Sequence, residues 1–506
     1  MVKSALLAAA ATIGLSASAL AETPQGAAEQ LRDFLNRFEN LGPGYATVVV
    51  TADDVLLNHV SGERRASTGA PLTADTPIYI ASQTKAYLGL VAAVLDERGV
   101  FSLDATIGDV WPDLGEAGGV DIRGYTMSDL LSHQVPINVG VINMIEAYSM
   151  TINPADYPRL IENFGEARDE GFEYDNLGYN IYAALLETAT GKSWQDWMDE
   201  VLFDPLGMDS TSARTSDYSL DELSWSHIWQ GEELGWYEQR PKTNHMMQSA
   251  GGLVTSTNDM AVWLQMQLRG EGPAGSGISA NAVSTAQQGY VQTGMEDRRN
   301  AYELVCSEYT LGWNVCDFEG YEVHIHGGGY IGARTQMAFV PELGVGIAAF
   351  ANSDNNTGWV TSRTINMYLQ FLVEHEDAEA WSTRRPEIYS QREGRLLEFR
   401  QGRDAEDRAN EQWGGWSWAP SHDELRQFVG TYSTGEPYLD VQVVYENGAL
   451  TAMWGDAPYP LTPAQQDLFG AQPYAFEGRE AFSFERDDSG RVVSMTWGDD
   501  TYARTQ

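Results

Sequence analysis

The stretch Ser82-Gln83-Thr84-Lys85 carries more information than any other part of this sequence, because it places a hydroxyl and an amine three residues apart. It follows the apolar run Pro77-Ile78-Tyr79-Ile80-Ala81. Apolar residues then recur at helical spacing, which predicts a helix from Ala86 to Arg98. Residues three apart share one face of a helix, so we expect the Ser82 hydroxyl and the Lys85 amine to point into the same volume.

This pairing suits nucleophilic catalysis. A serine hydroxyl is a weak nucleophile that needs a partner to accept its proton, and a partly desolvated lysine can lose its own proton and take that role. The spacing alone also fits a plain helix start with a solvated lysine. The composition favours the catalytic interpretation. The chain uses arginine almost everywhere but has a lysine here, and lysine, unlike arginine, can lose its proton in a protein. The chain uses lysine at four positions: Lys3, Lys85, Lys192 and Lys242.

Length and charge limit the classes of function. The 506 residues suffice for a catalytic domain and a smaller module. A net charge of −41, from 72 acidic and 31 basic residues, argues against nucleic acid and anionic membrane surfaces as partners. We therefore expect a small molecule or a short peptide as the partner, and the sequence leaves the oligomeric state open.

The first 21 residues have the features of a signal peptide. Lys3 supplies a positive start, 5–15 form an apolar run, and Ala19-Leu20-Ala21 is a small-residue cleavage site. The alternative is a membrane anchor, for which the apolar run is short. No later segment is long and apolar enough to span a bilayer. We expect an exported protein, periplasmic or secreted, cleaved near Ala21.

Beyond the signal peptide, the pattern predicts three parts. Residues 22–375 form a catalytic domain of mixed helices and strands, with Tyr309 to Asn314 as one strand and Tyr321 to His326 as another. Residues 376–422 are a charged, partly helical linker without a clear apolar face. In residues 423–506, five short alternating runs predict a small antiparallel β domain.

The two cysteines, Cys306 and Cys316, flank a predicted hairpin. In an oxidising compartment they could form a disulfide, and two free thiols are the alternative. No Cys/His spacing fits a zinc site, so we expect no metal.

Two further motifs follow downstream. Tyr174 and Asn176 lie two apart in a loop before a predicted helix, Leu177 to Thr190, so their side chains can face one cleft. His326-Gly327-Gly328-Gly329 ends a predicted strand, and its glycines would let a substrate backbone approach closely. Each motif alone also fits an ordinary loop or turn.

Taken together and in this order, Ser82-x-x-Lys85, Tyr174-x-Asn176 and His326-x-Gly328 resemble the serine β-lactamase and penicillin-recognising hydrolase family. The likeness is greatest to its class C β-lactamase, D-aminopeptidase, DD-carboxypeptidase and family VIII esterase branch, and it covers about residues 27–373. It implies an α/β (α+β) fold: an antiparallel sheet flanked by helices, beside an all-helical subdomain. The C-terminal module resembles the lipocalin-like β appendages of some members.

The resemblance also implies catalytic roles. Ser82 would attack a carbonyl and form an acyl-enzyme, while Lys85 and Tyr174 take and return protons. His326 would support the Tyr174 network and one end of the substrate. Residues 134–137, where the sequence departs from the common family pattern, would line the cleft.

The binding roles follow from the same resemblance. Asn176 would orient the substrate and the catalytic lysine. Gly328 would lie where the substrate backbone approaches the strand. The backbone N–H groups of Gly329 and Ser82 would form the oxyanion hole. No metal or organic cofactor is needed.

The function expected is hydrolysis of amide, peptide or ester bonds in small substrates, with short peptides or D-amino-acid amides favoured. One alternative is a carboxylesterase of the same family. Another is a β-lactam-binding sensor that turns over slowly. A complete proton-transfer set favours an enzyme over a sensor.

Overall fold

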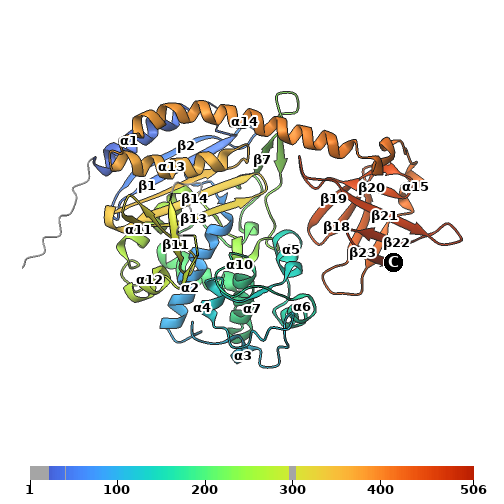
Figure 1. Ribbon diagram of the computed structural model, residues 1–506, viewed down its shortest axis with the longest axis horizontal. Helices are drawn as coiled ribbons and strands as arrows, with labels where there is room; N and C mark the ends of the chain where they lie inside the picture. The colour runs from blue at the N-terminus through green and yellow to red at the C-terminus, as the bar shows by residue number, and fades with distance from the viewer. Residues whose placement is uncertain (1–21, 40, 296–303, 506) are drawn as a thin grey trace, which may run out of the picture.

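The computed structural model describes residues 22–39, 41–295 and 304–505, and the predicted signal peptide lies outside these residues. The chain forms a sheet covered by helices, a helical region beside it, and a C-terminal barrel (Figure 1). None of the described helices is both long and apolar enough to cross a membrane. The predicted fold class is confirmed.

The main sheet of the described residues is antiparallel, with the strand order β10-β11-β12-β13-β14-β15-β1-β2-β3. Its order places the first hairpin of the chain beside the last strand of the catalytic region, with Tyr45 opposite Ala351. The strands are β1 (Gly44–Val50), β2 (Val55–Arg65), β3 (Ala70–Pro71), β10 (Val291–Gln292), β11 (Val305–Tyr309), β12 (Asn314–Phe318), β13 (Tyr321–Tyr330), β14 (Ala333–Val340) and β15 (Val345–Ala351).

Side chains alternate across this sheet, so each strand presents residues to both faces, and helices bury both faces. Tyr45 and Val49 of β1 pack in one apolar cluster with α1 (Pro24–Leu35) and α13 (Thr357–Leu372). Val48 and Val50 pack in another cluster with α2 (Thr84–Glu97) and α11 (Thr257–Arg269). The sheet is therefore a rigid support for the segments at its edges.

The helical region lies beneath the sheet in Figure 1 and holds more helices than the sequence pattern predicts. Its longest helix, α7, has the predicted bounds, Leu177–Thr190. The other helices are α3 (Ile107–Val110), α4 (Met127–Leu131), α5 (Gly140–Tyr148), α6 (Tyr157–Phe164), α8 (Trp194–Met198), α9 (Asp204–Leu206), α10 (Gln248–Gly251) and α12 (Ala280–Gln287). Short strand pairs join these segments: β4 (Ile78–Tyr79) with β9 (Val254–Thr255), β5 (Ile137–Asn138) with β6 (Glu166–Ala167), and β7 (Ser226–Trp229) with β8 (Trp236–Gln239).

The region expected to be a partly helical linker contains one long helix, α14 (Ala378–Arg408). Of its residues only Ala378, Ser382 and Tyr389 are buried, which explains why no apolar face marks it in the sequence. The helix lies against the catalytic region, where the Arg400 guanidinium donates to the Asp354 carboxylate at 3.3 Å.

The C-terminal barrel is closed, and all its strands pair antiparallel. Three of its strands, β19, β20 and β23, were not predicted; prolines at 458, 460 and 463 hide the first of them. Phe428, Phe469 and Phe484 contact one another in its interior. The strands are β16 (Gly430–Ser433), β17 (Val441–Glu446), β18 (Ala449–Trp454), β19 (Ala457–Gln465), β20 (Leu468–Ala471), β21 (Glu480–Arg486), β22 (Val492–Trp497) and β23 (Asp500–Arg504), preceded by α15 (His422–Arg426).

The barrel is docked on the helical region. The Ser149 hydroxyl donates to the Trp454 carbonyl at 2.7 Å, and the Asp456 N–H donates to the Ser149 carbonyl at 2.9 Å. The Thr243 hydroxyl donates to the Asp456 carboxylate at 2.6 Å. These reciprocal bonds fix the barrel beside α5.

Two predicted strands are corrected. The stretch from Tyr309 to Asn314 is not one strand: Tyr309 ends β11, Asn314 begins β12, and 310–313 form the turn between them. This hairpin places Cys306 opposite Cys316, and the structure joins these cysteines in a disulfide. The strand expected to end at His326 continues to Tyr330, because glycines in extended backbone can still pair, as Gly328 does with Thr335.

The β11–β12 turn packs directly on α2. A Cβ atom on Gly89 would lie 1.6 Å from the Leu311 carbonyl oxygen, so only glycine fits there. Gly394 of α14, in contrast, has nothing within 4 Å of its Cβ position.

Gly89→Ala should therefore lower the thermal unfolding midpoint, because overpacking costs about 1–3 kcal/mol and outweighs the helix propensity gained. The matched control Gly394→Ala should be neutral or stabilise the chain by up to about 1 kcal/mol. A Gly89→Ala midpoint as high as that of Gly394→Ala would contradict this packing.

Candidate active site

Ser82 lies in a tight turn rather than on the long helix. The chain passes from β4 through the 3-10 turn η1 (Ala81–Gln83) into α2. Ala81 has φ of 48°, in the left-handed region that non-glycine residues rarely adopt. This turn leaves Ser82 half-buried, while Lys85 is fully buried in the first turn of α2.

The Lys85 amine is held by three separate segments. Its Nζ donates to Asn176 Oδ1 and to the Ala250 carbonyl, each at 2.8 Å, and reaches Ser82 Oγ at 3.4 Å. Burial lowers the pKa of Lys85 to about 7, and the negative charge of Asp175 partly opposes this shift. A substantial fraction of the amine is thus neutral near pH 7 and able to accept a proton.

Tyr174 and Asn176 come from the loop before α7, as the sequence predicts. Asn176 occupies the N-cap position of that helix, and its amide oxygen faces Lys85. The Tyr174 ring centroid lies 5.0 Å from Lys85 Nζ, and 43% of the tyrosine is exposed. The phenol therefore lies between the buried amine and the open cleft.

The loop that carries these two residues is fixed from behind by contacts that the sequence did not reveal. The Asp175 N–H donates to His133 Nδ1 at 3.3 Å. Arg168 donates to the Val135 carbonyl at 2.8 Å and pairs with the Asp175 carboxylate at 3.3 Å. A lone arginine in a polar loop gives no local signal, so only the fold could show this role.

His326 faces the same cluster from β13. Its Nδ1 donates to the Gly327 carbonyl at 2.8 Å, which leaves Nε2 to accept from the Tyr309 hydroxyl at 3.2 Å. Burial, and then the positive charge of Lys85, lower the pKa of His326 to about 3. The imidazole is therefore neutral near pH 7. Tyr309 is a second residue that the sequence motifs missed.

The glycines after His326 bring β13 close to the serine turn. A Cβ atom on Gly328 would lie 2.0 Å from the Ile80 carbonyl oxygen, so a side chain at this position would push the strand away. Gly329 has only the Arg334 side chain within 4 Å of its Cβ position.

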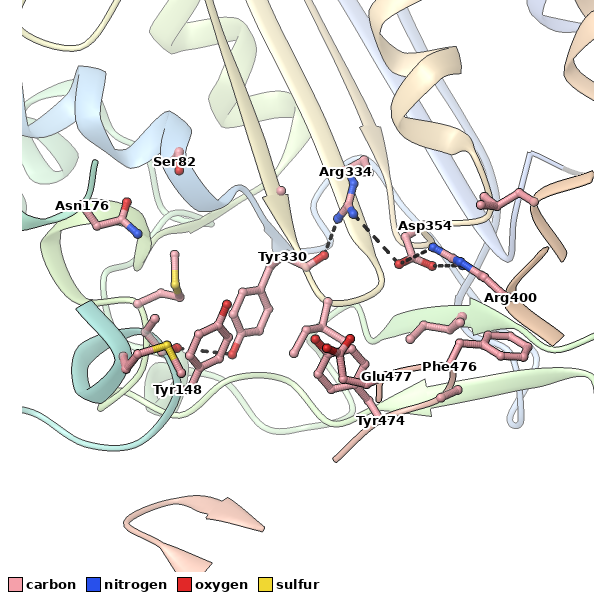
Figure 2. A pocket seen from close by; sticks show the side chains of 18 of the residues that line it. Ser82, Tyr148, Asn176, Tyr330, Arg334, Asp354, Arg400, Tyr474, Phe476 and Glu477 are labelled. Carbon is pink, nitrogen blue, oxygen red and sulfur yellow. Dashed lines mark hydrogen bonds and ion pairs between the residues drawn. The ribbon is translucent and has the colours of Figure 1, made fainter. Parts of the chain in front are cut away.

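Two cavities meet at Ser82. The first, about 860 Å³, extends past Asn176 and Tyr148 towards α14 and the barrel, and Figure 2 shows its lining. The second, about 890 Å³, runs along His326 and the glycines of β13. Ser82, Tyr174 and Gly329 line both cavities.

One expectation about the cleft is wrong. Residues 134–137 line neither of these cavities, because they turn towards β6, where Ile137 pairs with Ala167 and the Arg168 N–H donates to the Pro136 carbonyl at 3.0 Å. The neighbouring helix α5 supplies the wall instead, through Asn143, Met144, Ala147 and Tyr148.

Comparisons with known proteins agree with this arrangement. Residues 25–369 match the family model described as Beta-lactamase. The chain is 25% identical over 369 residues to Penicillin-binding protein 4 of Amycolatopsis lactamdurans, a match that covers 70% of this chain and 90% of that protein.

Solved structures share the fold at lower identity. The octameric penicillin-binding protein homologue from Pyrococcus abyssi has a TM-score of 0.57 and 18% identity, over 94% of this chain and 99% of that one. The D-amino acid amidase from Ochrobactrum anthropi SV3, in complex with L-phenylalanine amide, has a TM-score of 0.55 and 18% identity, over 70% and 98%. With the family model covering most of its length, the chain belongs to the β-lactamase family and is a serine hydrolase.

Proposed function

We propose that this serine hydrolase cleaves the amide or peptide bonds of short peptides or D-amino-acid amides through an acyl-enzyme on Ser82. The observation that carries the proposal is the buried Lys85 amine, 3.4 Å from Ser82 Oγ and with its pKa lowered to about 7. The fold shared with a D-amino acid amidase supports the choice of substrate class.

The first step is acylation. Ser82 Oγ attacks the substrate carbonyl as its proton passes to neutral Lys85, and the backbone N–H groups of Ser82 and Gly329 stabilise the oxyanion. The bond to the leaving amine then breaks, and that amine takes a proton through Lys85 and Tyr174. In the second step water attacks the ester and gives a proton to the same pair. The pair returns that proton to Ser82 Oγ as the ester bond breaks, which releases the acid and restores the serine hydroxyl.

The other residues position this pair. Asn176 and the Ala250 carbonyl hold Lys85 Nζ in place. Neutral His326 and Tyr174 both line the second cavity. We infer that the leaving group occupies this second cavity and that the acyl part of the substrate occupies the first, with Tyr174, which lines both cavities, within reach of the leaving group.

The compartment is part of the proposal. Residues 1–21 have the pattern of a signal peptide, and the Cys306–Cys316 disulfide suits an oxidising environment. We propose that the protein acts after export, in the periplasm or outside the cell.

A substrate panel tests the class. Purified protein is assayed with D- and L-alanine p-nitroanilides, p-nitrophenyl acetate and butyrate, and nitrocefin. We expect turnover of the anilides. Turnover of the esters alone would mean a carboxylesterase, and stable acylation by nitrocefin without turnover would mean a sensor; either result would overturn the proposed class.

Ser82→Ala should abolish hydrolysis of every substrate that the wild type accepts, because the nucleophile is lost, while leaving the unfolding midpoint nearly unchanged. Labelling by a fluorophosphonate probe checks this directly. The exposed Ser489→Ala serves as the control and should label like the wild type. A labelled Ser82→Ala would refute the assignment.

The pH profile follows from the lowered pKa of Lys85. Below pH 7 the protonated amine cannot accept the serine proton, so kcat/KM should rise with pH and level off above about pH 7. Lys85→Arg should lose about 10²–10⁴ in rate, because arginine stays protonated. The control Lys192→Arg, whose side chain pairs with Glu200, should keep activity. A flat profile from pH 5 to 9 would contradict the assignment of Lys85.

Tyr174→Phe should slow acyl transfer at least about tenfold, with little change in substrate affinity, since only the hydroxyl is lost. Single-turnover kinetics separates the two effects. Tyr445→Phe, on the barrel outside both cavities, is the matched control. Turnover within about threefold of wild type would exclude Tyr174 as a proton-transfer group.

A further inference from the structure

The far end of the first cavity combines three tyrosines with a carboxylate. Tyr148 belongs to α5, Tyr330 to the end of β13, and Tyr474 and Glu477 to the barrel loop between β20 and β21. Figure 2 shows Tyr474 and Glu477 reaching into the cavity from that loop, on the side of Tyr148 and Tyr330. Three regions far apart in the sequence, α5, the end of β13 and the barrel loop, thus line the same end of the cavity.

The aromatic part of this end is ordered. The Tyr148 and Tyr330 rings stack with centroids 5.9 Å apart, and the Tyr330 hydroxyl donates to the Ala147 carbonyl at 3.4 Å. The Tyr474 hydroxyl donates a hydrogen bond to the Glu477 carboxylate. Burial raises the pKa of both Tyr148 and Tyr474, and the negative charge of Glu477 adds to this effect.

The barrel loop is anchored on both sides to the end of α14. Gln472 donates to the Asp404 carboxylate at 2.8 Å. Arg479 pairs with Asp404 at 3.1 Å and with Asp407 at 2.9 Å. Glu477 is therefore presented by a loop whose two ends are fixed, as a preorganised binding group requires.

Glu477 differs from the other carboxylate of the cavity. Asp354 is neutralised by Arg400 at 3.3 Å and lies 4.0 Å from Arg334. Within residues 22–39, 41–295 and 304–505, no lysine or arginine forms an ion pair with Glu477. Glu477 thus accepts from the Tyr474 hydroxyl but has no cation beside it in this part of the chain, so its negative charge can attract a cationic ligand.

We propose that Tyr148, Tyr330, Tyr474 and Glu477 form a binding site for a protonated amine on the acyl part of the substrate. Ring faces attract an ammonium group, and a carboxylate accepts its hydrogen bonds. The inference rests on the proposed function and deepens it, because it selects substrates with a free amino terminus over N-acylated ones. The barrel then supplies part of the substrate site and no part of the proton-transfer machinery.

The test uses the full chain at pH 7, where most peptide amino termini are protonated. Alanyl-alanine p-nitroanilides of D and L configuration are compared with a free amine, an N-acetyl cap and an N-succinyl cap. We expect kcat/KM about tenfold to a hundredfold higher for the free amine than for the N-acetyl form, from one charged hydrogen-bonded contact. Glu477→Gln should remove this preference by lowering kcat/KM for the free amine to about the value for the N-acetyl form.

The control is Glu446→Gln, the same charge change at the exposed end of β17 in the barrel, which should behave as wild type. An equal rate for free and N-acetyl forms, a preference for the N-succinyl form, or a preference that survives in Glu477→Gln would overturn the amine site.

A second arm separates this inference from the proposed function. Alanyl-alaninamide and its N-acetyl form compete against hydrolysis of p-nitrophenyl acetate, so the arm works even if no anilide is cleaved. We expect the free amine to inhibit about tenfold more strongly, and only in proteins that keep Glu477. Equal inhibition by both forms would overturn the site, whatever bond the enzyme hydrolyses.

Discussion

The burial of one amine organises this protein. Lys85 Nζ is buried and contacts a serine hydroxyl, an asparagine oxygen and a backbone carbonyl, and no carboxylate of the described residues forms an ion pair with it. Burying an ammonium group without a charged partner is costly, so the environment favours the neutral form and lowers the pKa of Lys85 to about 7. The β-sheet, α7 and α10 must each lie correctly for this contact set to exist.

The same constraint explains which parts of the site could be predicted. Ser82 with Lys85, and Tyr174 with Asn176, are close in sequence, so their joint orientation follows from helix and loop geometry. The Tyr309–His326 contact joins two strands that do not pair with each other, and no local pattern signals it. The third motif therefore identified His326 but not Tyr309, the phenol that contacts its Nε2.

The fold shows a similar limit. Elements that are buried along most of their length, such as α7, β1 and β15, can be recognised in the sequence as continuous, largely apolar runs. The helix α14 does not, because its support comes from polar contacts such as that between Arg400 and Asp354. The strand β19 was missed because its prolines break the expected pattern. The helix α14 and the barrel hold the loop that lines the far end of the first cavity. That end of the site was therefore the part least predictable from the sequence.

The most direct test of the central claim is a titration of Lys85 itself. The sequence has lysine at four positions, so protein labelled with ¹³C at lysine Cε gives a simple spectrum. Burial also lowers the pKa of Lys242 to about 7, and the variants Lys85→Met and Lys242→Met assign the two signals. The structure predicts that the Lys85 signal titrates near pH 7. A Lys85 signal that shows no transition below pH 9 would contradict the account.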